Sequence, residues 1–436
     1  MNEFKTKLEN LLKEACIEFE KHGLPYQLWH KLERKEKSGT SFSEEQVIDK
    51  FLFPMWLHQF LMNNNLFREV CSTVIQNPDL SKKILIDGMG VPMTDPLYFD
   101  GKISHDIIAP FLIKYFKVIN NSFFNQALFN QMFYELMEII HRSSSTYISI
   151  SPLLNLDIDA GSYQIDPEIR IRKLTTDELE EWINTFSDLS DRSISAEQLP
   201  YTYCCIEINC AYKSLIDIDI LQKRSLPFQF VNLLNLVFEN NIYILLNEET
   251  YISPQEPYST GKSISNPNIL YNPGNILKLD DDKISRLKNL WQLLRKSPNA
   301  DLVRLAFNRW SNNVYRVDES DQILDYWIGL ESLFTPDSNQ DISYRAAIRI
   351  AAFLGETPEE RVKIYDDIKH SYGWRSAIIH GNLLNSKKLN EMNKKGTLHD
   401  TTIKTLSYLR KAILKLLESE EKFEPSLIEK KLLSKV

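Results

Sequence analysis

The sequence has 436 residues, of which 43% are hydrophobic and 25% charged, and its formal net charge is −8 at pH 7. These proportions exclude a mostly disordered, collagen-like or low-complexity chain. At roughly 100–200 residues per domain, we expect two or three domains. No uninterrupted apolar run of about 18 residues is present, and the first residues are charged throughout. We therefore expect a cytoplasmic protein without a signal peptide or a membrane partner.

Five cysteines bear on the redox and metal chemistry of the chain. Cys16 and Cys71 are isolated, whereas Cys204, Cys205 and Cys210 lie in one apolar stretch. An odd number without framework spacing argues against a disulfide scaffold. No CxxC pair or neighbouring histidine accompanies them, so we expect no zinc site. Buried thiols in a strand are the preferred interpretation.

The charge is divided unevenly along the chain. Residues 281–436 contain 26 basic and 22 acidic residues, whereas residues 1–280 contain 25 basic and 37 acidic ones. This asymmetry suggests different partners for the two parts. The basic excess of the C-terminal part is too small to identify a nucleic-acid-binding protein by itself.

The first 145 residues read as a helical region. Helical spacing of apolar residues predicts a helix over 3–22. A capping box formed by Ser43 and Gln46 predicts a helix over 47–63 that is kinked or broken at Pro54. Residues 105–141 are largely helical in pattern and carry an aromatic stripe typical of a core. The stripe comprises Phe111, Tyr115, Phe116, Phe123, Phe124, Phe129 and Phe133.

Residues 146–278 read as an α+β region. Strands are predicted over 146–150, 169–171, 203–211 and 242–246, and a helix over 227–237. A second capping box, Thr175 with Glu178, predicts the start of a short helix that continues through Trp182. The proline-rich stretch 251–275 is predicted to be a loop or linker, with a domain boundary just after it.

From residue 281 to 425 the pattern is that of a helical bundle. The predicted helices cover 282–296, 299–314, 319–335, 342–354, 359–380 and 400–419. The charged tail after Ser419 is expected to fray. The expected fold class is therefore mainly α, with an α+β N-terminal region and a C-terminal helical bundle.

One segment of this bundle carries candidate chemistry, because residues 371–382 read SYGWRSAIIHGN. Arg375 and His380 stand near a helix end, and Gly381 is well placed to terminate that helix. Imidazole can donate or accept a proton, and guanidinium binds phosphate oxygens. Such a pair is nearly the minimum for metal-independent RNA cleavage, in which the ribose 2′-OH attacks the adjacent phosphate.

Geometry limits what one copy of this pair can do. At about 100° per residue, a five-residue step turns roughly 140° around a helix, so the two side chains do not converge. A C2 dimer would bring two such helices together most simply. The alternative is that the spacing arises by chance and that the histidine only complements the helix dipole.

The surrounding blocks resemble a known family. Residues 325–334 read DYWIGLESLF, residues 343–347 read SYRAA, and the 371–382 segment follows in order. Together they resemble the Apea-like HEPN family, whose members carry an RxxxxH motif on a helical bundle. The resemblance covers residues from about 285 to about 420. The segment IRIRKLT at 169–175 also looks like the stretch that often precedes such domains.

The resemblance implies a metal-independent endoribonuclease without a cofactor that acts as a homodimer, often in prokaryotic anti-phage or abortive-infection defence. Its partners would be RNA, with transfer RNA a candidate, and a phage-derived trigger sensed by the N-terminal region. By position, Arg375 and His380 match the motif, and Ser376 occupies the polar position beside the arginine. Asn382 stands where related toxins often carry tyrosine, which argues against nucleotidylation at that site.

Other residues are candidates for supporting roles. Glu331 is expected to pair with Arg345 or Arg375, either to anchor the bundle or to orient Arg375. His370 is a candidate lining residue of the same groove. A lysine cluster beyond the motif is either a solvated face or a landing surface for the RNA backbone. It comprises Lys387, Lys388, Lys394 and Lys395.

Two alternatives to catalysis stay open. The bundle could be a catalytically silent module that binds RNA or protein, or the chain could be an interaction scaffold with its partner surface on the acidic N-terminal part. The sequence lacks a glycine-rich phosphate loop, a GxSxG elbow and an HExxH motif. These absences disfavour nucleotide hydrolases, serine hydrolases and zinc proteases.

Overall fold

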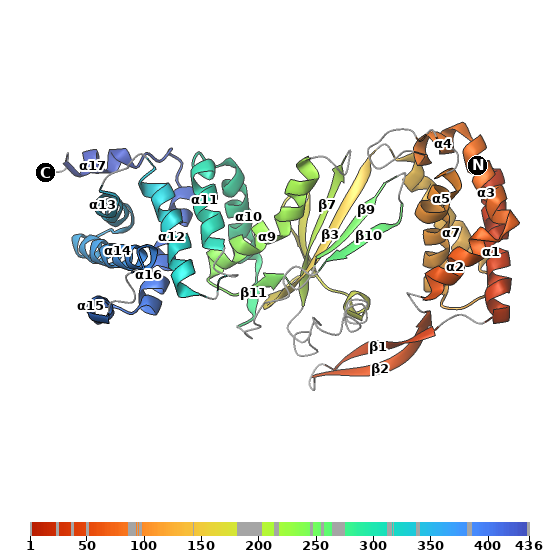
Figure 1. Ribbon diagram of the computed structural model, residues 1–436, viewed down its shortest axis with the longest axis horizontal. Helices are drawn as coiled ribbons and strands as arrows, with labels where there is room; N and C mark the ends of the chain where they lie inside the picture. The colour runs from red at the N-terminus through yellow and green to blue at the C-terminus, as the bar shows by residue number, and fades with distance from the viewer. Residues whose placement is uncertain are drawn as a thin grey trace. The chain divides into compact units, whose positions relative to one another are not determined.

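A computed structural model of the chain divides into two compact units, whose elements are labelled in Figure 1. The first unit comprises Met1–Gln229 and Ile242–Asp280, and the second comprises Phe230–Asn241 and Asp281–Val436. The described residues are mainly helical and include an antiparallel sheet, in agreement with the predicted class. Over these residues, no helix combines the length and apolar character needed to cross a bilayer. The structure describes residues 2–22, 26–35, 39–48, 52–85, 93, 95, 98–142, 144–180, 203–212, 218–244, 247–253, 257–263, 275–311, 316, 318–336, 341–381 and 386–433.

Helices form the beginning of the first unit. The predicted first helix is confirmed as α1 (Asn2–His22). Five of the seven stripe aromatics are buried, which confirms their core role, whereas Phe124 is only partly buried and Phe123 is exposed. The remaining elements are α2 (Leu52–Met62), α3 (Asn65–Gln76), α4 (Pro78–Ile84), α5 (Phe99–Ile103), the π-helix η2 (Ser104–Ile108), α6 (Ala109–Ile119) and α7 (Gln126–His141).

The predicted helix over 47–63 is wrong in its first part. Strands β1 (Tyr26–Lys35) and β2 (Gly39–Ile48) form an antiparallel pair in which Ser43 lies opposite Lys31. The Ser43–Gln46 capping box is therefore also wrong. A capping motif is a local signal, and here the backbone hydrogen bonds to the neighbouring strand prevail. Helix α2 begins only at Leu52, so Pro54 lies in its first turn, where a missing N–H costs little.

The sheet of the first unit contains the predicted β-prone segments. Its strands lie in the order β10 (Ser259–Ser263), β9 (Asn247–Ile252), β3, β7, β6 and β5, and β8 also pairs with β3. Strands β3 (Ser145–Leu154), β6 (Ile169–Lys173), β7 (Cys204–Tyr212) and β8 (Tyr243–Ile244) confirm the predicted strands. All three cysteines of β7 are buried thiols that form no disulfide with the other described cysteines. The short strands are β4 (Leu156–Ile158), β5 (Ser162–Gln164) and β11 (Leu277–Leu279), and β4 and β11 pair in parallel.

Two predictions in this region need correction. The stretch predicted as linker contains β10 (Ser259–Ser263), which pairs antiparallel with β9 (Asn247–Ile252). Strand pairing is a non-local interaction that a proline-rich composition does not reveal. The helix predicted over 227–237 is the longer α9 (Ile218–Phe238), which keeps Pro227 inside it. Residues Phe230–Asn241, at its C-terminal end, belong to the second unit.

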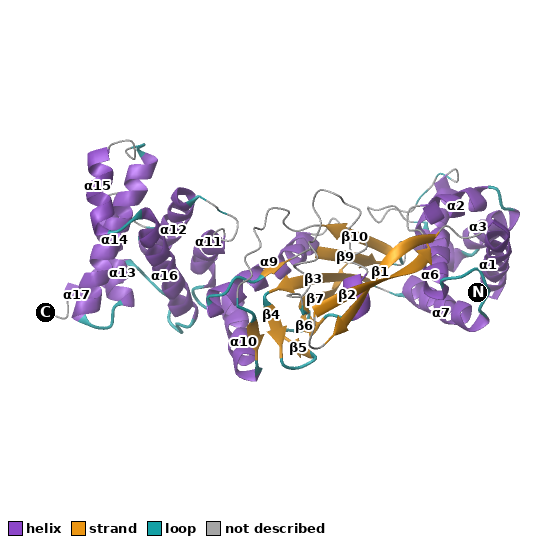
Figure 2. Cartoon of the chain, turned by 90° about the horizontal axis from the view of Figure 1, so that it is seen from below, coloured by secondary structure: helices purple, strands orange, loops and turns teal. Residues whose placement is uncertain are grey.

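All regular structure described within residues 281–433 is helical (Figure 2). The six predicted helices are confirmed within a few residues at each end. Helix α12 packs against α11 and α16, and α13 packs against α14. The confirmed helices are α10 (Asp281–Lys296), α11 (Ala300–Ser311), α12 (Glu319–Phe334), α13 (Ile342–Leu354), α14 (Pro358–Ile379) and α16 (Leu398–Leu417).

Two further helices were not predicted, α15 (Ser386–Lys395) and α17 (Ser426–Leu433). The expectation that the chain frays after Ser419 is wrong for the segment that leads into α17. The Phe423 ring packs against Phe353 in a tilted arrangement, 4.9 Å between ring centroids, and its N–H donates to Asn299 Oδ1 at 2.7 Å. Side chains distant in sequence thus hold a segment whose own composition is charged.

Asn299 is 1% exposed and connects this tail to the bundle. Its Nδ2 donates to the carbonyl oxygens of Leu416 and Glu421, each at 3.0 Å. Replacing it by alanine removes all three hydrogen bonds and leaves the half-buried Phe423 N–H without its partner, at about 1–3 kcal/mol if water cannot reach it. Asn299→Ala is therefore expected to destabilise the second unit by about 1–3 kcal/mol and to accelerate amide exchange over 421–433.

Hydrogen exchange measured by mass spectrometry, together with urea unfolding, checks this expectation. Asn308→Ala is the matched control, because Asn308 is exposed on α11, the helix that directly follows Asn299. Equal exchange rates over the tail in the two variants would contradict the role assigned to Asn299.

Candidate active site at the end of α14

Helix α14 carries the motif, and local interactions define both of its ends. At the N-terminus, Thr357 and Glu360 form a reciprocal capping box, and Pro358 occupies the first turn. At the C-terminus, His380 is the capping residue, and Gly381 follows with a φ of 64°. A left-handed conformation favours glycine, so the prediction that Gly381 terminates the helix is confirmed.

A buried hydrogen-bond chain fixes α14 against two neighbours. Ser371 is 1% exposed, and its Oγ accepts a hydrogen bond of 2.9 Å from Trp327 Nε1 on α12. The same oxygen lies 2.6 Å from the Oγ1 of Thr405 on α16, which donates onward to the Thr401 carbonyl. Because buried polar groups need partners, this chain restricts α14 to one position in the bundle.

Arg375 lies one turn after Ser371, at a half-buried position. Its Nη2 is 3.1 Å from Oε1 of Glu331, so of the two partners expected for Glu331, the structure selects Arg375. The guanidinium also lies over the ring of Tyr372, 5.3 Å from the centroid. That ring in turn meets Trp327 edge-on at 5.1 Å. The arginine is thus held by a carboxylate and an aromatic face while remaining 23% exposed.

The Glu331 carboxylate has fewer stabilising partners among the described residues than the Arg375 guanidinium that it holds. Only Oε2 accepts an aligned hydrogen bond from Arg375, at 3.3 Å, and Oε1 is buried without one among the described residues. Burial raises the pKa of the Glu331 carboxyl above its ordinary value of 4.5, and the Arg375 charge opposes this shift without cancelling it. The ion pair therefore holds the arginine at a cost in desolvation.

His380 contrasts with Arg375. Its side chain is exposed and has no hydrogen bond or ion pair within the described part of the chain, whereas its backbone N–H donates to the Ser376 carbonyl at 3.1 Å. Ser376 itself is half-buried on the last turns of α14. Because α14 is regular up to Ile379, the two motif side chains project from it about 140° apart.

The other candidate residues divide into described and undescribed ones. Lys394 and Lys395 are exposed in the last turn of α15. Lys387 and Lys388 belong to the same helix, but their side chains lie outside the described residues, as does the whole of Asn382.

His370 is occupied by a structural contact that spacing alone did not reveal. Its Nε2 lies 3.1 Å from the Gly396 carbonyl and 3.2 Å from Trp374 Nε1. Gly396 has a φ of 153°, and it precedes α16. The imidazole therefore helps to hold the turn between α15 and α16.

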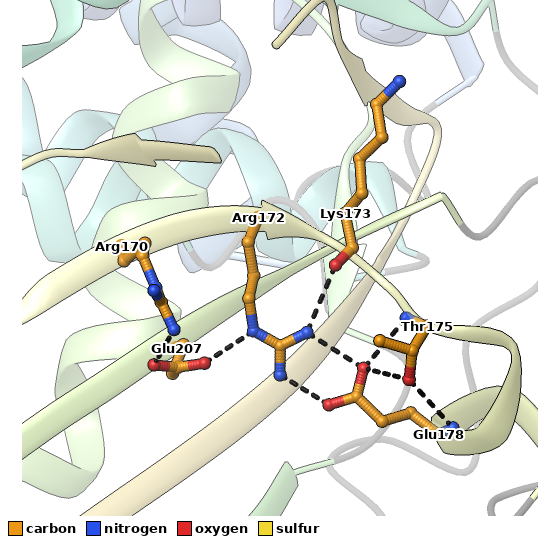
Figure 3. Close-up of polar contacts among 6 residues, drawn as sticks. All are labelled: Arg170, Arg172, Lys173, Thr175, Glu178 and Glu207. Atoms are coloured by element: carbon orange, nitrogen blue, oxygen red, sulfur yellow. Dashed lines mark hydrogen bonds and ion pairs between the residues drawn. The ribbon is translucent and has the colours of Figure 1, made fainter. Parts of the chain in front are cut away.

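The segment 169–175 carries a separate polar network on the sheet (Figure 3). Arg172 donates through Nε to Glu207 at 2.5 Å and through Nη2 to Glu178 at 2.5 Å. Glu207 also accepts from Arg170, and Glu178 closes the predicted capping box with Thr175. Every carboxylate here has a cationic partner, so the network ties the short helix that begins after Thr175 to strands β6 and β7.

A second network lies on the opposite face of the sheet, as strand register requires. Glu249 is 7% exposed and accepts hydrogen bonds from the hydroxyls of Tyr147 and Tyr251 and from Arg224 on α9. Burial raises the pKa of Glu249, but these partners prevail and hold it below its ordinary value. A fully partnered carboxylate of this kind stabilises the packing of α9 on the sheet.

Within the ranges that the structure describes, no three His, Cys, Asp or Glu side chains lie close enough together to hold a metal ion. Comparisons with known protein families, curated proteins and solved structures find no match to this chain. The geometry of α14 and the sequence resemblance are therefore the basis for inferring a function.

The raised pKa of Glu331 predicts a pH dependence of stability. A carboxyl whose folded pKa lies above its unfolded value binds more protons when folded, so its ionisation at higher pH lowers the free energy of unfolding. Glu331→Gln removes this ionisation while keeping an acceptor for Arg375. We expect the stability of the variant relative to wild type to rise as the pH increases from 4.5 to 7.

Urea unfolding across this pH range measures the difference. Glu391→Gln, at an exposed position of α15, is the control for loss of one carboxylate. A variant that loses stability relative to wild type as the pH rises would show that the ion pair outweighs desolvation.

Proposed function

We propose that the second unit is a metal-independent endoribonuclease of the HEPN type. The observation that carries this proposal lies at the C-terminal end of α14. There Glu331 holds the guanidinium of Arg375, and five residues later the exposed imidazole of His380 has no partner among the described residues. The three resembling sequence blocks fall on α12, α13 and α14 of one helical unit, which supports the resemblance. In this proposal the unit is an HEPN-type bundle.

Each side chain would have a distinct role in the reaction. The 2′-OH of the ribose attacks the adjacent phosphorus, and an imidazole of His380 accepts its proton. Arg375 stabilises the negative charge that builds up on the phosphorane oxygens. The bond to the 5′-oxygen then breaks, and that oxygen takes a proton. The products are a 2′,3′-cyclic phosphate and a 5′-OH end.

A homodimer would supply what one copy lacks. One α14 presents its two motif side chains about 140° apart, so a second copy related by C2 symmetry is needed to face His380 with another imidazole and guanidinium. One imidazole would then accept the 2′-OH proton while the other donates to the leaving oxygen. Ile379, next to His380, is 51% exposed, which is compatible with an apolar contact there.

The first unit would have a regulatory role in this scheme. A nuclease that cuts cellular RNA needs restraint, and a defence protein would release it on sensing a phage-derived trigger. The regulatory region would comprise the helical part and the sheet of residues 1–278. RNA, including transfer RNA, would be the substrate class.

Cleavage of total RNA and transfer RNA in EDTA tests the activity. Wild type is expected to cut and to leave 2′,3′-cyclic phosphate ends. His380→Ala should lose about 10²–10⁴-fold in rate, because it lacks the proton carrier. Arg375→Lys should lose about 10²-fold, since a point charge does not replace a forked donor.

His399→Ala is the matched control, because His399 is also exposed on the second unit, where it pairs with Glu319. It should retain full activity. A requirement for added divalent metal, or undiminished cleavage by His380→Ala, would refute the mechanism. Equal RNA binding by wild type and His380→Ala, with no cleavage or toxicity from either in cells, would favour the silent binding module.

The end of α15 provides an RNA-binding test. Lys394 and Lys395 are exposed, and each phosphate contact they make to a single strand contributes about 0.7 to the slope of log affinity against log salt. Lys394→Gln with Lys395→Gln is therefore expected to lower that slope by about 1.4. Binding of a labelled RNA to the His380→Ala protein at several salt concentrations measures it.

Lys296→Gln with Lys411→Gln removes the same charge from exposed positions on α10 and α16 and is the control. Equal slopes for the two double variants would show that the α15 lysines form only a solvated face.

A further inference from the structure

A pocket in the helical part of the first unit has no role in the chemistry proposed above. It lies between the C-terminal half of α1 and the end of α2, with a volume of about 680 Å³. That volume falls within the range of roughly 300–1,000 Å³ typical of ligand sites. Its lining residues are Glu14, Glu18, Phe19, His22, Trp56, Gln59, Phe60, Asn63 and Asn64.

Aromatic rings form the apolar part of the pocket. Phe19 is 3% exposed and lies 6.0 Å from Phe60 between ring centroids. Trp56 is 40% exposed, although it is the largest apolar side chain of α2. An indole that lines a pocket and remains this exposed offers a free π face to a ligand.

The charged groups of the pocket are mainly negative. Glu14 and Glu18 are four residues apart on α1 and therefore share one face of the helix. Glu18 pairs with His22 at 3.0 Å, whereas Glu14 has no partner among the described residues. Among the lining residues that the structure describes, none is a lysine or an arginine. The pocket is thus complementary to a cation and unfavourable for a phosphate.

Asn64 adds a hydrogen-bond donor. It is 8% exposed, and its Oδ1 caps α3 by accepting from the Phe67 N–H at 3.2 Å. Its Nδ2 has no partner in the described part of the chain, although the side chain lines the pocket. A pocket-lining amide donor without a partner among the described residues can pair with an acceptor in the occupant. A free metal ion or a simple polyamine provides none, whereas a peptide carbonyl does.

We propose that this pocket binds an arginine side chain of a peptide segment from another protein. The guanidinium stacks on the Trp56 indole and pairs with Glu14, since arginine combines a planar cation with forked donors. The aliphatic part of the side chain packs on Phe60. A backbone carbonyl of the peptide accepts from Asn64 Nδ2. This binding does not depend on the nuclease activity proposed for the second unit.

Fluorescence anisotropy on the full chain tests the proposal with a fluorescein-labelled peptide that alternates arginine and leucine. The matched probe carries citrulline in place of arginine, which keeps the shape and removes the charge. We expect the citrulline peptide to bind at least about tenfold more weakly. Equal affinity of the two peptides, or no binding of the arginine peptide, would overturn the proposal.

Substitutions in the lining test whether the peptide binds in this pocket. Glu14→Gln with Glu18→Gln should weaken the arginine peptide about tenfold, and Trp56→Ala several-fold. The control is Glu3→Gln with Glu20→Gln, which removes the same charge from exposed positions of α1 outside the pocket. If the control variant weakens binding as much as the Glu14→Gln, Glu18→Gln variant, the peptide is attracted by the overall negative charge and not by the pocket.

Asn64→Ser tests the peptide contact specifically. Serine keeps an oxygen that caps α3 but lacks the amide donor. The variant should fold with unchanged helix content by circular dichroism and bind the arginine peptide several-fold more weakly. Unchanged affinity would show that the occupant makes no contact with Nδ2.

Discussion

The hydroxyl of Ser371 connects three helices of the second unit, and the position of α14 depends on it. It receives the indole N–H of Trp327 from α12 and lies within hydrogen-bond distance of Thr405 on α16. A buried, satisfied polar chain of this kind specifies one packing arrangement where apolar contacts alone would tolerate several. Because Arg375 and His380 lie within the next three turns, their placement follows from this chain.

The Glu331–Arg375 pair shows a compromise between stability and preorganisation. The carboxylate is half-buried and loses hydration, as its raised pKa records, yet its oxygen holds one end of a guanidinium that stays in contact with solvent. A site that binds a phosphate benefits from an arginine held in advance, because less side-chain entropy is lost on binding. The desolvation of Glu331 is the energetic cost of that arrangement.

Sequence patterns predicted the elements whose signals are local. The helices of the second unit follow from apolar periodicity and polar breaks, and Gly381 was identified because a left-handed residue at a helix end favours glycine. Predictions were wrong where distant partners decide the structure: the β1–β2 hairpin replaced a helix start, and Asn299 orders the charged tail from more than a hundred residues away. At the site, the sequence limits the expected partners of Glu331 to Arg345 and Arg375, and only the packing of the helices brings Arg375 into contact with it. The contact of His370 with Gly396 lacked any local signal.

The central claim is that Arg375 and His380 act on a ribose 2′-OH and its phosphate. Single-turnover cleavage of an RNA with one mapped cut site tests this most directly when the nucleotide 5′ to the cut carries a 2′-deoxy substitution. If the 2′-OH is the nucleophile, the substituted strand stays uncut at that position while other sites are cut at their normal rates. Cleavage of the deoxy-substituted bond at the rate of the unmodified one would contradict the mechanism and require another nucleophile.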